Sequence, residues 1–108
     1  MKNNFIELNE ANFGREVLNA MRPMLVEFWA SWAESCTVMT PVLESVAKED
    51  AVSVKIARVN VERHESLADQ YEVRAVPTLL LFNQGALQDQ IVGRTTEQAV
   101  RERLERLA

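Results

Sequence analysis

The segment Met24–Ala30 constrains the fold more strongly than any other part of the chain. It reads Met-Leu-Val-Glu-Phe-Trp-Ala, so that Glu27 alone interrupts a run of apolar, largely β-prone side chains. A strand that is apolar on both faces is typical of the centre of a sheet that helices cover on both sides. We therefore expect a buried central strand here, and helices elsewhere in the chain to cover both faces of its sheet.

The segments around this strand alternate between strand and helix patterns. The other candidate strands are Phe5–Leu8, Val52–Val61, Thr78–Phe82 and Gln88–Val92, the last two joined by a turn at Asn83–Gly85. The candidate helices are one that follows Asn9 and ends before Pro23, one over Ser35–Glu49, one over Glu65–Tyr71, and one that opens at the capping box Thr95–Gln98. The predicted order is βαβαβαββα, which gives a mixed sheet with helices on both faces and an α/β fold class.

Apolar spacing predicts which face of each helix is buried. In the first helix, which Asn9 would cap, the predicted inner face holds Phe13, Val17, Leu18 and Met21. In the second helix the predicted stripe holds Cys36, Met39, Val42, Leu43, Val46 and Ala47, and in the last helix it holds Val100, Leu104 and Leu107. At Ile56-Ala57 the alternation of the predicted strand slips, which indicates either burial on both sides or a bulge.

Composition limits the classes of function. The 108 residues suit one domain over 1–108, and a net charge of −4 gives no reason to expect nucleic acid or an anionic membrane as a partner. The N-terminus lacks an apolar signal segment, and no apolar run is long enough to span a membrane. A single cysteine allows no disulfide within the chain, which fits a cytoplasmic location. We expect a monomer without a cofactor or bound metal.

Four short motifs are informative when they are taken together. They are Phe28–Trp32, a proline at position 41 inside a helix, Ala75–Thr78 before an apolar strand, and Val92-Gly93 before the last helix. With the order of elements, these motifs resemble the thioredoxin family over essentially the whole chain. The resemblance implies the thioredoxin fold, with Pro77 in the cis form beside the active site.

The active-site motif departs from that family. Where the family reads Cys-Gly-Pro-Cys, this chain reads Ala33-Glu34-Ser35-Cys36. By the resemblance, Ala33 occupies the position of the attacking cysteine and Cys36 that of the resolving cysteine. Thiol–disulfide exchange of the family type needs both sulfurs. Because Glu34 and Ser35 differ as well, the motif favours natural divergence over a single knockout substitution.

Two residues near this motif each have a functional and a structural interpretation. Cys36 is either an inert buried side chain, a monothiol that forms mixed disulfides or takes up glutathione, or, least in keeping with its surroundings, a metal ligand. Glu27 matches the family position of an acidic residue that assists proton transfer at the resolving cysteine. The alternative is that Glu27 is a structural carboxylate paired with Arg58. The single histidine, His64, is interpreted as a solvated loop residue.

The resemblance also implies a binding surface for protein segments in extended form. Its residues in this chain are Trp32, Val76, Pro77, Val92 and Gly93. We therefore expect a thioredoxin-like protein that binds client or partner segments in the groove beside Pro77 and has lost normal protein-disulfide reduction. The alternatives are a monothiol oxidoreductase that uses Cys36, and an active-site variant of an ordinary disulfide reductase.

Overall fold

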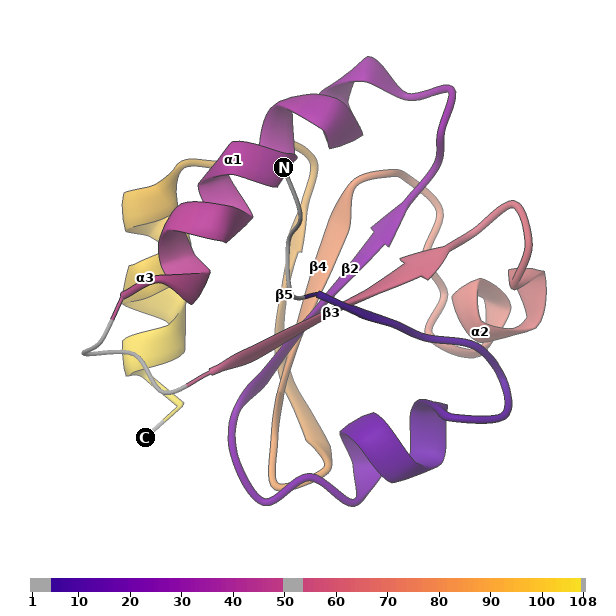
Figure 1. The fold of residues 1–108 in the computed structure, drawn as a ribbon, viewed down its shortest axis with the longest axis horizontal. Coiled ribbons are helices and arrows are strands. Elements are labelled where there is room, and N and C mark those ends of the chain that lie inside the picture. Colours follow the sequence, from indigo (N-terminus) through magenta and orange to yellow (C-terminus); the bar gives the residue numbers. More distant parts are fainter. Residues whose placement is uncertain (1–4, 50–53, 108) are drawn as a thin grey trace.

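Residues 5–49 and 54–107 are described by the computed structural model, and over these residues the chain forms one five-stranded sheet flanked by helices (Figure 1). The elements are β1 (Ile6–Glu7), η1 (Gly14–Leu18), β2 (Met24–Trp29), α1 (Glu34–Ala47), β3 (Lys55–Asn60), α2 (Glu65–Gln70), β4 (Thr78–Asn83), β5 (Ala86–Val92) and α3 (Glu97–Glu105). The predicted order of elements is confirmed. The predicted strand start at Val52 lies outside the described residues.

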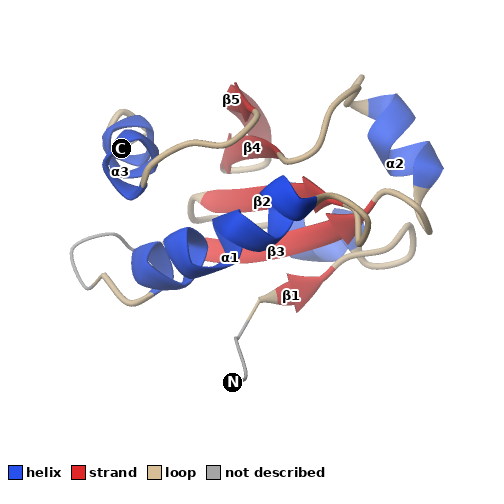
Figure 2. Cartoon of the chain, turned by 90° about the horizontal axis from the view of Figure 1, so that it is seen from above, coloured by secondary structure: helices blue, strands red, loops and turns tan. Residues whose placement is uncertain are grey.

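The strand at Met24–Trp29 lies at the centre of the sheet, as its apolar run predicts. The strand order is β1-β3-β2-β4-β5, which Figure 2 shows from above. β1 and β2 run parallel to β3, whereas β4 is antiparallel to both β2 and β5. The sheet is therefore mixed. β2 and β3 pair without interruption through Ile56 and Ala57, which are both buried, so the slip in alternation reflects burial on both sides and not a bulge.

Helices cover both faces of the sheet and divide the core into two layers (Figure 1). On one face α1 and α3 pack on alternate residues of the strands, such as Leu25 and Leu81, through Met39, Leu43 and Val100. On the other face, η1 and α2 pack on the intervening residues. This second layer includes Phe13, Val17, Val26, Phe28, Leu67, Leu80 and Phe82. Alternate burial on two faces explains why β2 needs apolar side chains at nearly every position.

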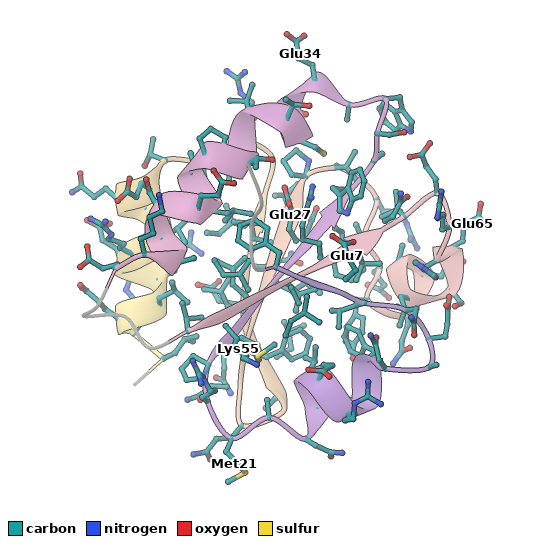
Figure 3. All side chains as sticks on the ribbon, in the orientation of Figure 1. Glu7, Met21, Glu27, Glu34, Lys55 and Glu65 are labelled. Carbon is teal, nitrogen blue, oxygen red and sulfur yellow. The ribbon has the colours of Figure 1, made fainter. Side chains whose placement is uncertain are left out.

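The first helix is shorter than its pattern predicts. Asn9 does cap this region, because its Oδ1 accepts hydrogen bonds from the backbone N–H groups of Ala11 and Asn12. The helix ends at Leu18, in a wide turn in which the N–H of Asn19 donates to the carbonyl of Gly14. The prediction that Leu18 and Met21 share the buried face is therefore wrong. Leu18 is exposed, and Met21 is 78% exposed in the loop beyond the helix (Figure 3).

Smaller differences occur at the ends of other elements. α1 begins at Glu34, one residue early, and Ala47 at its end is exposed and not part of the buried stripe. The cap of α3 is Thr96, whose Oγ1 accepts a hydrogen bond from the N–H of Ala99. Its inner face is as predicted, with Val100 and Leu104 buried and Leu107 partly buried against the same core. β5 starts at Ala86, because Gln84 and Gly85 form a tight turn with positive φ angles of 52° and 82°.

Candidate functional site

The loop between β2 and α1 brings the conspicuous motif to one end of the sheet. Ala33 is the residue before α1, with extended angles of φ −94° and ψ 110°, and its side chain provides no capping hydrogen bond. It is only 6% exposed and packs with Ala30 and Cys36. Glu34 follows at the first helical position and projects outward from the tip of the helix (Figure 3). The position that the family resemblance gives to the attacking sulfur is thus a small, covered methyl group.

Cys36 lies on the inner face of α1, as its place on the apolar stripe predicts. The side chain is 2% exposed, and half-buried Trp29, Val61 and Val76 pack around its cluster. Burial raises the pKa of the Cys36 thiol, and the nearby charge of Glu27 raises it further. A backbone hydrogen bond from Ala30 and the positive charge of Arg58 oppose this increase in pKa only in part. Because thiolate is the nucleophilic form, a raised pKa and burial both make this sulfur unreactive.

Glu27 is fully buried in β2 and lies near the middle of the molecule (Figure 3). Its Oε1 accepts a hydrogen bond of 3.0 Å from Nε of Arg58, so the predicted pairing is present. Its Oε2 has no hydrogen-bond partner among the described residues. Burial is the largest influence and raises the pKa of Glu27, while the charge and hydrogen bond of Arg58 partly offset it.

A second carboxylate holds the loop in place. Oε1 of Glu62 accepts hydrogen bonds from the backbone N–H of Ser31 at 2.8 Å and from its hydroxyl at 2.9 Å. These two hydrogen bonds lower the pKa of Glu62. The sequence offered no signal for this contact, since it depends on the loop after β3 lying beside the loop after β2. It fixes the residue that precedes Trp32.

Trp32 and the segment before β4 form an exposed apolar surface beside this loop. Trp32 is 72% exposed, and next to it a shallow hollow of about 160 Å³ is lined by Trp32, Val61, Val73, Arg74, Ala75 and Val76. The Val76–Pro77 peptide bond is cis, and the carbonyl of Pro77 accepts a 2.8 Å hydrogen bond from the N–H of Gly93. That hydrogen bond joins half-buried Gly93, and with it exposed Val92, to the same surface. The structure therefore brings together the five residues expected to bind protein segments.

Comparison with known proteins agrees with this architecture. The family model for thioredoxin matches residues 4–106. The chain belongs to the thioredoxin family. A thioredoxin from Buchnera aphidicola, from the pea-aphid strain APS, is 37% identical over 95% of each chain. Thioredoxin 1 of Synechococcus elongatus is 38% identical over 80% of each chain, and thioredoxin 2 of Chlorobaculum tepidum is 33% identical over 97% of this chain and 96% of its own.

Membership of the thioredoxin family indicates thiol–disulfide oxidoreductase chemistry. Cys36 is the single cysteine of the sequence, so its thiol is the one available for such chemistry. Within residues 5–49 and 54–107, His, Cys, Asp and Glu side chains form no group of three that could hold a metal ion. Over the same residues, no helix is long and apolar enough to cross a membrane.

His64 lies in the loop before α2, as predicted, but its side chain is only partly exposed and contacts a carboxylate that the sequence did not indicate. Its Nδ1 lies 2.8 Å from Oε1 of Glu10, and the hydroxyl of Ser66 donates to Oε2 of the same carboxylate. Glu10 thereby joins the loop after β1 to the start of α2. Val61 and Val73, which line the hollow beside Trp32, were also not anticipated. The carboxyl ends of parallel strands lie at one edge of a sheet. The position of Val61 just after β3 could therefore have indicated that it lies near the loop after β2, which carries Trp32.

Proposed function

We propose that this thioredoxin-family chain binds extended segments of client or partner proteins and does not reduce their disulfides by the usual two-cysteine cycle. One observation carries the proposal. Ala33 occupies the N-terminal position of α1 where attack would begin, while the remaining thiol, that of Cys36, is buried beneath it. The surface for protein segments and the chemistry of reduction are therefore separable in this molecule.

The loss of reduction follows from the requirements of the reaction. Disulfide exchange begins when a thiolate attacks one sulfur of the substrate, and a second thiol then resolves the mixed disulfide. The methyl group of Ala33 has no electron pair to donate. Ser35, two residues further along the chain, carries a hydroxyl that donates a long hydrogen bond of 3.4 Å to the carbonyl of Val76. That hydroxyl has no base beside it among the described residues, so it does not replace the sulfur.

Glu27 has no step to assist without an attacking sulfur. In the family arrangement an acidic residue at this position would exchange a proton with the resolving thiol. Here Glu27 is paired with Arg58, and its burial keeps its pKa above that of an ordinary glutamate. We therefore assign Glu27 a structural role in this chain, with proton exchange as the role it would regain if a second sulfur were present.

The binding half of the proposal rests on a surface that we call the client surface, made of Trp32, Val76, Pro77, Val92 and Gly93. Exposed Trp32 and Val92 offer apolar contact to a partner. The backbone N–H of Val76 donates to no acceptor among the described residues, and its carbonyl holds only the long bond from Ser35. A partner segment in extended form can add to such a backbone by strand-like hydrogen bonds, while its side chains contact the apolar hollow.

The proposal also covers the oligomeric state, the location and the class of partner. We propose that the chain acts as a single-domain monomer in the cytoplasm, with protein segments and not nucleic acid or membrane as its partners. A net charge of −4 supports the exclusion of polyanions as partners. The client surface is apolar at its centre, which is typical of a protein-binding site.

A second candidate function is monothiol exchange at Cys36 with a small disulfide. The observation that favours it is a cleft, distinct from the client surface, that Cys36 helps to line. Incubation with oxidised glutathione followed by mass measurement of the intact protein tests this candidate. A glutathione adduct on native protein would support it, and an adduct that forms only after unfolding would exclude it.

The client surface is tested by selecting binders from a random peptide library displayed on phage. Affinities of the selected peptides are then measured for the parent chain and for Val92→Asp, which places a charge on the client surface. We expect binding about tenfold weaker or worse, because an apolar contact is replaced by a charge that must be desolvated. Met21→Asp is the matched control, since Met21 is equally apolar and lies at the end of the molecule opposite Glu34 (Figure 3). Peptides that bind both variants as they bind the parent would contradict the proposed surface.

A further inference from the structure

A second hollow in the structure shares no lining residue with the one beside Trp32. This Cys36 cleft has a volume of about 230 Å³ and is lined by Trp29, Ala30, Ser31, Cys36, Thr37, Thr40 and Arg58. Arg58 is the one charged side chain of this lining. A cleft of this size suits a small molecule and not a folded partner. It lies between α1 and β3 and shares no residue with the client surface, although Val76 of that surface packs against the cluster that holds Cys36.

Arg58 is held rigidly in this cleft by contacts on two sides. Its Nε donates to Oε1 of Glu27, and its Cζ lies 4.3 Å from the centre of the Trp29 ring. The side chain is 14% exposed. The two terminal nitrogens, Nη1 and Nη2, make no hydrogen bond with the described residues, so that one edge of the guanidinium is free. An edge with two parallel N–H donors matches the two oxygens of a carboxylate.

Other residues of the same lining carry donors that make no hydrogen bond with the described residues. Thr37 and Thr40 are three residues apart in α1, and neither hydroxyl makes a hydrogen bond with the described residues. The Nε1 of Trp29 is buried and also has no partner among them. The hydroxyl of Ser31 is already used by Glu62. Unused donors therefore predominate, and they favour a ligand that accepts hydrogen bonds.

The buried carboxyl behind Arg58 does not remove this preference. Glu27 engages the Nε edge of the guanidinium and leaves the terminal edge free. The hydrogen bond from Nε is the one contact that the structure gives between Arg58 and this carboxyl among the described residues. Because Glu27 and the Trp29 ring already fix the guanidinium, a ligand would lose little side-chain entropy in binding to it.

We propose that the Cys36 cleft binds a small organic carboxylate, which Nη1 and Nη2 of Arg58 hold end-on while the hydroxyls of Thr37 and Thr40 donate to its oxygens. The ligand lies next to the thiol of Cys36 but needs no covalent step with it. This proposal does not depend on client binding, and either can fail without the other.

Acetate is the probe for the first test, and neutral acetamide, which has nearly the same shape, is its control. We expect acetate to shift the nuclear magnetic resonance signals of the Trp29 indole N–H and the Thr37 and Thr40 amides in a saturable way, and acetamide to leave them unchanged. Arg58→Lys keeps the cation beside Glu27 but removes the paired donors, so acetate should bind about tenfold more weakly. Arg74→Lys, which changes the other hollow, should bind acetate as the parent does.

A second variant guards against a change of fold at position 58. Thr40→Val removes one hydroxyl at constant shape, and acetate affinity should fall several-fold while the spectrum otherwise stays that of the parent. Shifts that do not saturate, that acetamide reproduces, or that Arg58→Lys and Thr40→Val leave unchanged would overturn the proposal.

The thiol provides an independent readout, because iodoacetate and iodoacetamide alkylate the same sulfur and differ in the carboxylate. The ratio of the two rates cancels the exposure and the pKa of Cys36. We expect the iodoacetate-to-iodoacetamide ratio to be several-fold higher in native protein than in urea-unfolded protein, and the excess to disappear in Arg58→Lys. An equal or lower ratio in native protein would contradict a carboxylate site. If neither reagent reacts with native protein, the acetate titration alone decides.

Discussion

Nε of Arg58 lies 3.0 Å from Oε1 of Glu27, and the two residues stand directly opposite each other on the neighbouring parallel strands β3 and β2. The pair lies where the apolar run of the central strand is interrupted. A buried carboxylate is tolerated only with a partner, and removing that partner leaves an uncompensated charge in the core. This relationship makes the stability of the fold depend on pH.

The first prediction concerns that dependence. Burial raises the pKa of Glu27 in the folded protein above the ordinary value of 4.5, so the folded state binds more protons than the unfolded state between 4.5 and the raised pKa. The stability that Glu27 contributes is fully present below pH 4.5 and is lost as pH rises through this window. Glu27→Gln cannot ionise and lacks this loss.

Urea unfolding of the parent and Glu27→Gln at a series of pH values measures the effect. The free energy of unfolding of the parent minus that of the variant should decline with rising pH above 4.5. Contributions from Glu10 and Glu62, whose pKa values are lowered, are shared by both proteins and cancel. A difference that grows with pH would mean that Arg58 outweighs burial at this site.

The second prediction concerns the start of α1. Ala33 precedes the helix without a side-chain acceptor for its first N–H groups. Ala33→Ser supplies a hydroxyl that can accept from the N–H of Ser35, and we expect a gain of about 1 kcal/mol in the free energy of unfolding. Ala47→Ser, an exposed change in the last turn of the same helix, is the control and should cost a few tenths of a kcal/mol. Equal effects at both ends would argue against a capping role for position 33.

The third prediction separates backbone strain from a steric clash at two glycines. Both Gly85 and Gly93 have positive φ, at 82° and 89°. A Cβ at Gly85 would lie 2.3 Å from the backbone oxygen of Leu18, whereas one at Gly93 would meet no atom within 4 Å. Gly93→Ala should therefore cost about 1 kcal/mol from strain alone, and Gly85→Ala clearly more, by thermal or urea unfolding. Similar losses would show that the turn after β4 can move away from η1.

The fourth prediction concerns the reactivity of Cys36. Its burial and raised pKa predict that a neutral thiol reagent labels native protein at least about a hundredfold more slowly than unfolded protein. The double variant Cys36→Ala, Val38→Cys moves the thiol two positions along α1 to an exposed site and provides the reference rate. Labelling of native Cys36 at the rate of that exposed thiol would contradict an inert sulfur.

The parts of the fold that the sequence predicted are those determined by local pattern. The apolar run of β2, the stripe through Cys36 and Met39, and the turn before β5 each carry a periodicity or a turn residue that constrains one element. The end of the first helix at Leu18 carries no such signal. The helix ends where the backbone of Leu18 lies against Gly85 in the β4–β5 turn, a contact between residues far apart in the sequence.

The candidate site divides in the same way. The buried position of Cys36 followed from its helical spacing. The need to partner a buried carboxylate predicted only that Glu27 has a partner, and the family resemblance pointed to Arg58 as one of two interpretations of Glu27. Two contacts could not be predicted in this way: the hydrogen bonds of the Glu62 carboxylate with Ser31, and that of the Glu10 carboxylate with His64. The first joins residues that are 31 positions apart in the sequence, and the second joins residues that are 54 positions apart. No local preference encodes such contacts. They arise once the sheet has brought the ends of its strands together.

The most direct test of the central claim is an insulin-reduction assay with a dithiol reductant, in which the parent chain is compared with Ala33→Cys. We predict that insulin is reduced in the presence of the parent chain no faster than by the reductant alone. Ala33→Cys should reduce insulin faster than that, because it places a thiolate at the start of α1 above the resolving sulfur of Cys36. The double variant Ala33→Cys, Cys36→Ala should reduce insulin no faster than the parent chain. Catalysed reduction by the parent chain at a rate equal to or above that of Ala33→Cys would contradict the account.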